Sequence, residues 1–116
     1  MNNKLIIAID FDGTIVDHRY PDIGEPKPNV VNVLKRLLNE GHTLIIWTCR
    51  GGSELIAVYE WLKLRKLQDI LVNVNVPYEQ INFQPSPKIY ADMYIDDRNL
   101  GGMPEDWEEI YKLINQ

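Results

Sequence analysis

Cysteine and long apolar runs are scarce in this chain of 116 residues, and both shortages restrict what it can be. Cys49 is the single cysteine, so the chain cannot form an internal disulfide or a thiolate zinc cluster, which favours a reducing compartment. The apolar run near the start covers residues 5–9 and is stopped by Asp10. Signal peptides need about 7–15 apolar residues and membrane spans about 20. We therefore expect a cytoplasmic protein with no membrane partner.

Basic residues are also in the minority. The chain has 12 Lys and Arg against 17 Asp and Glu, which gives a formal net charge of −5 and a pI near 4.9. This balance argues against a nucleic-acid partner bound through a broad basic surface. Hydrophobic residues make up 45% of the chain and charged residues 25%, as in ordinary globular proteins. Length and composition together predict one domain over residues 1–116.

Short apolar runs alternate with segments of helical periodicity. Runs typical of buried strands cover residues 5–9, 43–48, 70–74 and 93–95. Apolar side chains at the spacing of one helical face cover residues 30–38, 55–62 and 107–114. This alternation predicts an α/β fold, namely a single Rossmann-like, three-layer domain with a parallel sheet of about four strands.

Local signals refine the expected elements. Pro28 suits the first turn of the first helix, and Gly41 suits the position after its end. Tyr59 is expected on the buried face of the second helix. A further short helix is expected to begin near Pro87 and Lys88.

Polar side chains stand at the carboxyl ends of the predicted strands. They are Asp10 and Asp12 after the first strand, Thr48 at the end of the second, and Asp96 and Asp97 after the fourth. Lys88 opens the segment before the fourth strand. Ligands of open parallel sheets bind outside the carboxyl ends of the strands, so we expect these groups to converge on one edge.

The four acids at these strand ends repel one another unless a cation is bound or some of them are protonated. Oxygen ligands without a neighbouring histidine or thiolate favour Mg²⁺. Thr48 and the free N–H groups of the turn after it can hold a phosphate, and Lys88 can neutralise its charge. A metal, a cation, an anion cradle and a nucleophile are the parts of a phosphoryl-transfer site. Once the four acids are assigned to this site, the remaining acids exceed the bases by one, so charge alone does not exclude a nucleic-acid substrate.

These residues also resemble the four motifs of the haloacid dehalogenase-like hydrolases. The first motif corresponds to residues 6–15, which read IIAIDFDGTI, and the second to residues 44–48, which read LIIWT. Lys88 corresponds to the third motif, and residues 94–97, which read YIDD, correspond to the fourth. The motifs occur in the family's order over residues 6–97, so the resemblance covers nearly the whole chain.

The resemblance implies a phosphatase with a role for each motif. Asp10 would be the nucleophile that forms an aspartyl-phosphate, and Asp12 would be the general acid and base. Thr48 would hold the phosphate, and Lys88 would stabilise its charge. An aspartate at the position of Asp12 marks the family's phosphatases rather than its dehalogenases.

The same resemblance implies the ligands of a Mg²⁺ cofactor. The ion would be bound by Asp10, by the backbone carbonyl of Asp12 and by the acidic pair. Within the pair, Asp97 is favoured as the direct ligand, with Asp96 behind it, and this order is left open.

The spacing between the motifs leaves no room for a cap domain. Asp12 and Thr48 are separated by 35 residues, and Thr48 and Lys88 by 39, most of which the expected helices and strands occupy. The resemblance therefore implies a capless member with an open site, which a second copy of the chain in a homo-oligomer could cover. The expected substrate is a small phosphorylated molecule, whose identity the sequence does not predict.

Two loop segments supply candidates for substrate contact. Residues 16–27 match the family's flap, in which His18, Arg19 and Tyr20 are either substrate contacts or surface residues. Cys49 and Arg50 directly follow the second motif. Arg50 is expected either to reach the substrate or to serve the helix end, and Cys49 is expected to lie beside the site as a chemically inert packing residue.

Two other functional classes remain as alternatives. A phospho-accepting receiver domain uses a similar set of residues, but its phospho-accepting aspartate ends the third strand, where this chain has Asn73-Val74-Asn75. A catalytically idle Mg²⁺-binding interaction protein could have the same fold, but no core catalytic residue is missing from this sequence.

Overall fold

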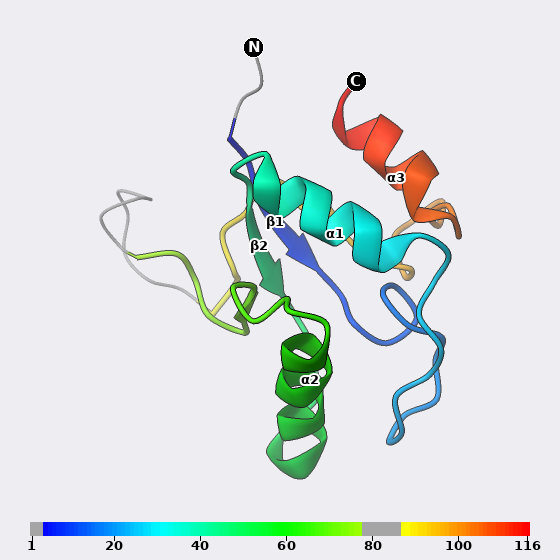
Figure 1. The fold of residues 1–116 in the computed structure, drawn as a ribbon, viewed down its shortest axis with the longest axis vertical. Coiled ribbons are helices and arrows are strands. Elements are labelled where there is room, and N and C mark those ends of the chain that lie inside the picture. Colours follow the sequence, from blue (N-terminus) through cyan, green and yellow to red (C-terminus); the bar gives the residue numbers. More distant parts are fainter. Residues whose placement is uncertain (1–3, 78–86) are drawn as a thin grey trace.

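The computed structural model describes residues 4–77 and 87–116 and confirms the expected α/β fold. Four strands form one parallel sheet in the order β3-β2-β1-β4, with β1 (Ile6–Ile9), β2 (Thr43–Ile46), β3 (Leu71–Val72) and β4 (Met93–Ile95). Three helices accompany the sheet, namely α1 (Val30–Asn39), α2 (Gly52–Leu64) and α3 (Trp107–Ile114) (Figure 1). None of the helices in these two ranges has the length and apolar character needed to cross a bilayer.

Three of the strands end in register, which brings the residues after them to one edge of the sheet. Ile9 of β1 pairs with Ile46 of β2 and with Ile95 of β4. The following backbone groups continue this register, because Asp10 N donates to Ile95 O over 2.9 Å and Trp47 N donates to Ile9 O over 2.9 Å. The carboxyl ends of β1, β2 and β4 therefore lie side by side, where a ligand site is expected.

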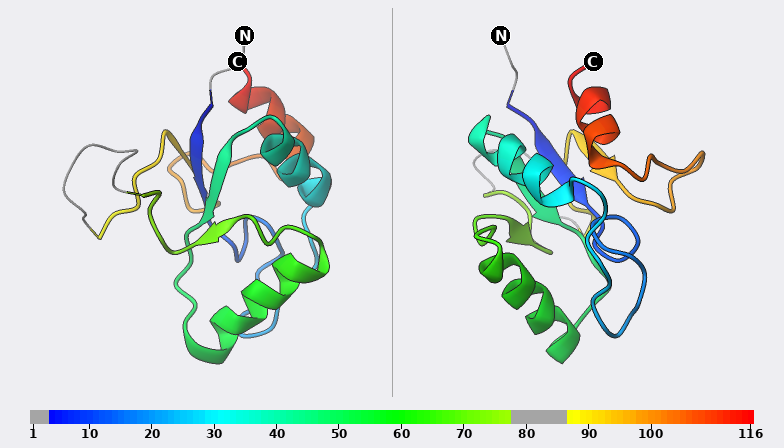
Figure 2. Two further views of the ribbon diagram at one scale, coloured as in Figure 1. Left: turned by 60° about the vertical axis from the view of Figure 1, so that its left-hand side comes forward. Right: turned by 45° about the vertical axis from the view of Figure 1, so that its right-hand side comes forward.

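One face of the sheet carries all three helices. Buried residues of α1, α2 and α3 form one cluster with alternate strand residues, among them Ile7 and Ile46. α1 and α3 lie beside each other (Figure 2), and the described residues on either side of the gap between β3 and β4, among them Val76 and Ile89, pack on the opposite face of the sheet. On that side Ile45 packs with Val76 and Ile89. In the described part of the chain, this second face of the sheet is therefore covered by irregular segments.

α1 begins at Val30, two residues after its proline. Asn29 precedes the helix with a left-handed φ of 64°, so Pro28 lies outside the first turn and not within it. Val33 and Leu37 are among the buried residues that face the sheet, as the helical spacing predicts. After the helix, Gly41 has a φ of 92°, which confirms its expected place beyond the helix end.

Three other local expectations differ from the structure. β3 covers two residues only, because Asn73 has a left-handed φ of 53° that ends the extended conformation. In α2 the buried aromatic residue is Trp61, whereas Tyr59 is 50% exposed. The chain from Pro87 to β4 contains a bend and no helix, because it carries Ile89 onto the second face of the sheet.

α3 fixes the loop that follows β1. Asp106 caps the helix by accepting a hydrogen bond from Glu108 N over 2.9 Å. Trp107 is fully buried, and its Nε1–H donates to Thr14 O over 2.9 Å. Trp107 N also donates to Pro28 O over 3.0 Å. The indole therefore joins the last helix to the loop that carries the first motif.

Candidate active site

Three aspartates form an acidic cluster at the carboxyl ends of β1 and β4. Asp10, Asp96 and Asp97 each offer a carboxylate oxygen, and these oxygens lie within 4.8 Å of one another. All three residues are half-buried. A set of close oxygen donors of this kind suits Mg²⁺, which prefers carboxylates and water to nitrogen or sulfur. The side chain of Asp12 does not belong to the cluster, so three of the four predicted carboxylates converge.

Thr14 holds two members of the cluster in place. Its Oγ1 lies 3.1 Å from Asp10 Oδ2 and 3.0 Å from Asp97 Oδ1, and it accepts a hydrogen bond from Asp97 N over 2.9 Å. The side chain is fully buried, and Trp107 fixes its backbone carbonyl. Sequence reasoning missed Thr14 as a site residue, although its hydroxyl lies within the first motif.

Gly13 leaves the space that Asp97 occupies. Its φ is +88°, and a Cβ atom at this position would lie 2.6 Å from Asp97 Oδ2. A side chain here would therefore be strained and would also displace the Asp97 carboxylate. The glycine of the first motif serves the acidic cluster as well as the turn.

The crowding of carboxylates changes the chemistry of Asp10. Burial raises the pKa of Asp10 from 3.8 to about 7, and its hydrogen bond with Asp97 and the negative charge of Asp96 add to this rise. The hydrogen bond from Thr14 acts in the opposite direction. A divalent cation among these oxygens would favour the ionised form of Asp10.

Asp12 points away from the cluster and is bound by Arg50. The Arg50 Nε–H donates to Asp12 Oδ2 over 2.7 Å, and an Nη2–H donates to Asp12 Oδ1 over 2.8 Å. The other N–H groups of Arg50 donate to backbone carbonyls, namely Pro21 O over 3.0 Å, Glu54 O over 3.3 Å and Asp22 O over 2.7 Å. All five N–H groups of the guanidinium are thus engaged, which leaves none for a substrate. Of the two roles expected for Arg50, its bond to Glu54 O in the first turn of α2 fits the one at the helix end.

Thr48 is held at the end of β2 by an asparagine on the neighbouring strand end. Thr48 N donates to Asn73 Oδ1 over 2.8 Å, and Asn73 Nδ2 donates to Thr48 O over 3.0 Å. The Thr48 hydroxyl accepts a hydrogen bond from Arg50 N over 3.1 Å. Sequence reasoning missed Asn73, because an asparagine after a strand is an ordinary turn residue.

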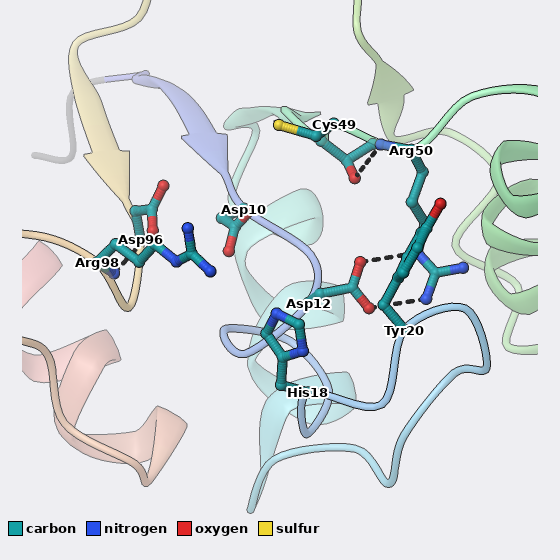
Figure 3. A pocket seen from close by; sticks show the side chains of 9 residues that line it. Asp10, Asp12, His18, Tyr20, Cys49, Arg50, Asp96 and Arg98 are labelled. Carbon is teal, nitrogen blue, oxygen red and sulfur yellow. Dashed lines mark hydrogen bonds and ion pairs between the residues drawn. The ribbon is translucent and has the colours of Figure 1, made fainter.

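A cavity of about 350 Å³ opens above these strand ends. Its lining residues come from the ends of β1, β2 and β4 and from the flap (residues 16–27) (Figure 3): Asp10, Asp12, His18, Tyr20, Thr48, Cys49, Arg50, Asp96 and Arg98. Most of the predicted site residues therefore surround one space. Cys49 is exposed to this space and is not the packing residue that we expected.

The flap forms one wall of the cavity. Asp17 N donates to Glu25 O over 2.7 Å, which ties the two sides of the flap together. His18 and Tyr20 line the cavity. Arg19 lies between them in sequence but is exposed and does not line the cavity. The structure thus does not bring Arg19 to the site.

Lys88 also lies outside the cavity. Its side chain is exposed, and its Nζ lies 5.1 Å from the centre of the Tyr94 ring. Tyr94 donates its hydroxyl to Ile89 O over 2.6 Å, on the sheet face that carries no helix in the described residues. The lysine of the third motif therefore lies beside Tyr94 of β4 and does not line the cavity.

Arg98 supplies a cation that sequence reasoning missed. It follows the acidic pair, its backbone N donates to Asp96 Oδ1 over 2.8 Å, and its guanidinium points into the cavity toward Asp10 (Figure 3). No hydrogen bond or ion pair of its side chain is found within the described residues. In the sequence, nothing distinguishes Arg98 from a solvated surface arginine.

Comparisons with known proteins agree with this site. A family model described as haloacid dehalogenase-like hydrolase matches residues 7–101, a range that includes every residue of the cavity. A comparison with curated proteins finds no match. A solved structure of a conserved protein coded by a locus from Bacteroides thetaiotaomicron is 49% identical, covers 97% of this chain and 91% of that chain, and superposes with a TM-score of 0.86. The chain therefore belongs to the haloacid dehalogenase-like hydrolases.

Proposed function

We propose that this hydrolase is a Mg²⁺-dependent phosphomonoesterase that acts through an aspartyl-phosphate on Asp10. The observation that carries the proposal is the position of Asp10. It belongs to a cluster of three carboxylates that suits a divalent cation, and it lines the same cavity as Thr48 and Asp12. A nucleophile, an oxygen-rich cation site and an anion cradle in one cavity are the parts that phosphoryl transfer needs.

Mg²⁺ would be held by Asp10, Asp97 and the backbone carbonyl of Asp12, with Asp96 at the cavity side of the cluster. When bound, the ion would offset the repulsion among the carboxylates, keep Asp10 ionised and balance the charge of the phosphate. The rest of the chemistry belongs to side chains of the chain itself.

In the proposed reaction, an Asp10 oxygen attacks phosphorus and the bond from phosphorus to the ester oxygen breaks. Asp12 gives its proton to the leaving oxygen, which departs as an alcohol. Asp12 then takes a proton from a water molecule that attacks the phosphorus of the aspartyl-phosphate. The acyl–phosphate bond breaks at phosphorus, which restores the Asp10 carboxylate and releases inorganic phosphate.

The phosphate would be held by Thr48 and by Arg98. Thr48 contributes its hydroxyl and adjoins the turn before α2, where backbone N–H groups favour an anion. Lys88 is the family's usual source of positive charge, but Arg98 is the cation that points into the cavity here. We therefore assign the neutralisation of the phosphate charge mainly to Arg98.

The cavity supports a small phosphorylated substrate. Its volume of about 350 Å³ lies at the lower end of the range for small-molecule sites. His18 and Tyr20 of the flap would contact the part of the substrate beyond the phosphate. A panel of phosphorylated metabolites, assayed for phosphate release with Mg²⁺ and with EDTA, would identify the class of substrate. Release that is equally fast in EDTA would exclude the proposed role of the metal.

Membership of the hydrolase family does not favour a receiver domain. The remaining alternative is an idle Mg²⁺-binding protein, and an experiment with beryllofluoride distinguishes it from a phosphatase. With Mg²⁺, beryllofluoride mimics a phosphoryl group on an aspartate, so it should raise the melting temperature of the wild type if Asp10 accepts phosphate. The shift should be absent from Asp10→Asn. A shift without turnover of any phosphate ester would instead indicate an idle Mg²⁺-binding protein.

A further inference from the structure

We propose that Arg50 is a positioning residue that holds the flap and the Asp12 carboxylate in one fixed arrangement beside Asp10. The kinetic tests of this proposal rest on the proposed phosphatase function. The positioning role of Arg50 goes beyond that function. The proposal follows from the five hydrogen bonds of its guanidinium, which reach three separate segments of the chain.

Arg50 contacts all three of these segments at the cavity wall. Two N–H groups hold the Asp12 carboxylate after β1, two reach the flap carbonyls of Pro21 and Asp22, and one reaches Glu54 O in the first turn of α2. Arg50 itself follows β2. One side chain thus connects the ends of two strands, the flap and a helix.

The surroundings of Arg50 make it a rigid connection. Its side chain is 1% exposed, and the guanidinium lies 5.0 Å from the centre of the Tyr20 ring and 5.7 Å from that of Phe11. Cation–π contacts of this kind are stronger when the cation is desolvated. Tyr20 lines the cavity, so Arg50 sets the position of the wall as well as that of the carboxylate.

Asp12 keeps its capacity to act while it is bound. A carboxylate has about four acceptor positions, of which the paired N–H groups of a guanidinium use two. The Asp12 side chain is 13% exposed and lines the cavity, so its remaining positions are open to the proton that it transfers and to a substrate or a water. The pair therefore fixes the direction of the carboxylate without removing it from the site.

Arg50→Lys is the sharpest test, because lysine keeps the charge but cannot make five hydrogen bonds in one plane. We expect kcat to fall by about 10-fold to 100-fold, since small displacements of a catalytic group cost this much. The loss should be greater with phenyl phosphate than with p-nitrophenyl phosphate, because the poorer leaving group depends more on the proton from Asp12. Competitive inhibition by inorganic phosphate should change little, since Arg50 has no N–H group free for a phosphate.

A second measurement needs no enzyme activity. Asp17 N and Lys27 N are hydrogen-bonded at the base of the flap, to Glu25 O and Ile15 O. In Arg50→Lys, amide hydrogen exchange at these two positions should rise about tenfold or more, because the flap loses its two bonds to the guanidinium. In Arg50→Ala, added methylguanidinium should restore part of kcat and of this protection.

Arg36→Lys is the matched control. Arg36 also binds a carboxylate, with Nη2 at 2.8 Å from Glu108 Oε2, and also lies over an aromatic ring, that of Tyr111, at 4.4 Å. It joins α1 to α3 outside the cavity, so its replacement should change neither the leaving-group dependence nor flap exchange. A uniform loss across leaving groups, unchanged exchange or a gain of activity in Arg50→Lys would overturn the proposal. A wild type that releases no phosphate would count against the proposed function, and the exchange comparison would still decide the role of Arg50.

Discussion

Arg98 and Arg19 are both exposed arginines on loops beside the catalytic cavity. Arg98 lines the cavity and faces Asp10, whereas Arg19 lies outside it. The two residues carry the same charge and so contribute equally to the net charge of the protein. Any difference between their effects on activity must therefore come from their different positions relative to the cavity and not from net charge.

Arg98→Gln should raise KM for a phosphate ester by about tenfold, because a charge-assisted hydrogen bond to the phosphate contributes about 1.5–3 kcal/mol. Steady-state kinetics on p-nitrophenyl phosphate measures this effect. Arg19→Gln makes the same change of charge and should leave KM within about twofold, as surface charges do. Equal effects of the two substitutions would mean that Arg98 does not contact the phosphate.

The residues of the site were predictable where a strand end alone determines their position. Asp10 and Asp96 follow β1 and β4 directly and Thr48 lies two residues after β2, so the register of the sheet carries them to one edge. The positions of Lys88 and Arg19 depend instead on how a loop turns, and hydrophobic periodicity contains no information about that. Arg50 shows a third case, because its role depends on contacts with a flap more than 25 residues earlier in the chain.

At the scale of elements, α3 supports the site although none of its residues lines the cavity. Trp107 at its first turn is fully buried and donates its Nε1–H to Thr14 O. Thr14 in turn contacts both Asp10 and Asp97. The last helix and the catalytic loop are therefore mechanically connected through one hydrogen bond.

Trp107→Phe should lower the free energy of unfolding by about 2–3 kcal/mol, because it leaves a buried carbonyl without a donor and removes part of a buried ring. It should also weaken Mg²⁺ binding, since Thr14 would no longer be fixed. Urea denaturation and Mg²⁺ titration measure the two effects. Trp47→Phe is the control: Trp47 is 40% exposed, so its replacement should change stability by less than about 0.5 kcal/mol. Equal losses for the two variants would contradict the role given to the indole.

The elements themselves were predictable where the apolar pattern is long. All four strands and three helices lie where hydrophobic runs and helical spacing predict them. Two errors lie elsewhere, because the short helix expected near Pro87 is absent from the described residues and Tyr59 is exposed, and the others occur at the ends of elements. Asn73 adopts a left-handed conformation that ends β3, and its side chain binds Thr48. Asn29 is also left-handed, so α1 begins only after it. Both asparagines serve tertiary contacts that a local pattern does not contain.

At the scale of the whole molecule, the acidic cluster makes stability depend on pH. The pKa of Asp10 is about 7 in the folded protein without metal against 3.8 for the free side chain, so the folded state binds a proton more tightly. Stability of the metal-free protein should therefore fall as pH rises from 3.8 to about 7. Because Asp10 is partly exposed, solvent screening limits this loss to about 1–2 kcal/mol.

Urea unfolding in EDTA at pH 5 and pH 8 measures this dependence. Asp10→Asn removes the group that titrates, so it should be more stable than the wild type at pH 8 and less sensitive to pH. Saturating Mg²⁺ should remove most of the difference in the wild type's free energy of unfolding between pH 5 and pH 8, because the ion offsets the repulsion among the carboxylates. Identical pH profiles for the wild type and Asp10→Asn in EDTA would show that the cluster does not raise the pKa of Asp10.

The most direct test of the proposed function is hydrolysis of p-nitrophenyl phosphate by the wild type and by Asp10→Asn. The wild type should release p-nitrophenol and inorganic phosphate with Mg²⁺ and stop in EDTA. Asp10→Asn should fold and lose about 1,000-fold or more of this activity, because the amide cannot attack phosphorus. Wild-type activity in Asp10→Asn, or in EDTA, would contradict the assignment of Asp10 as a Mg²⁺-dependent nucleophile.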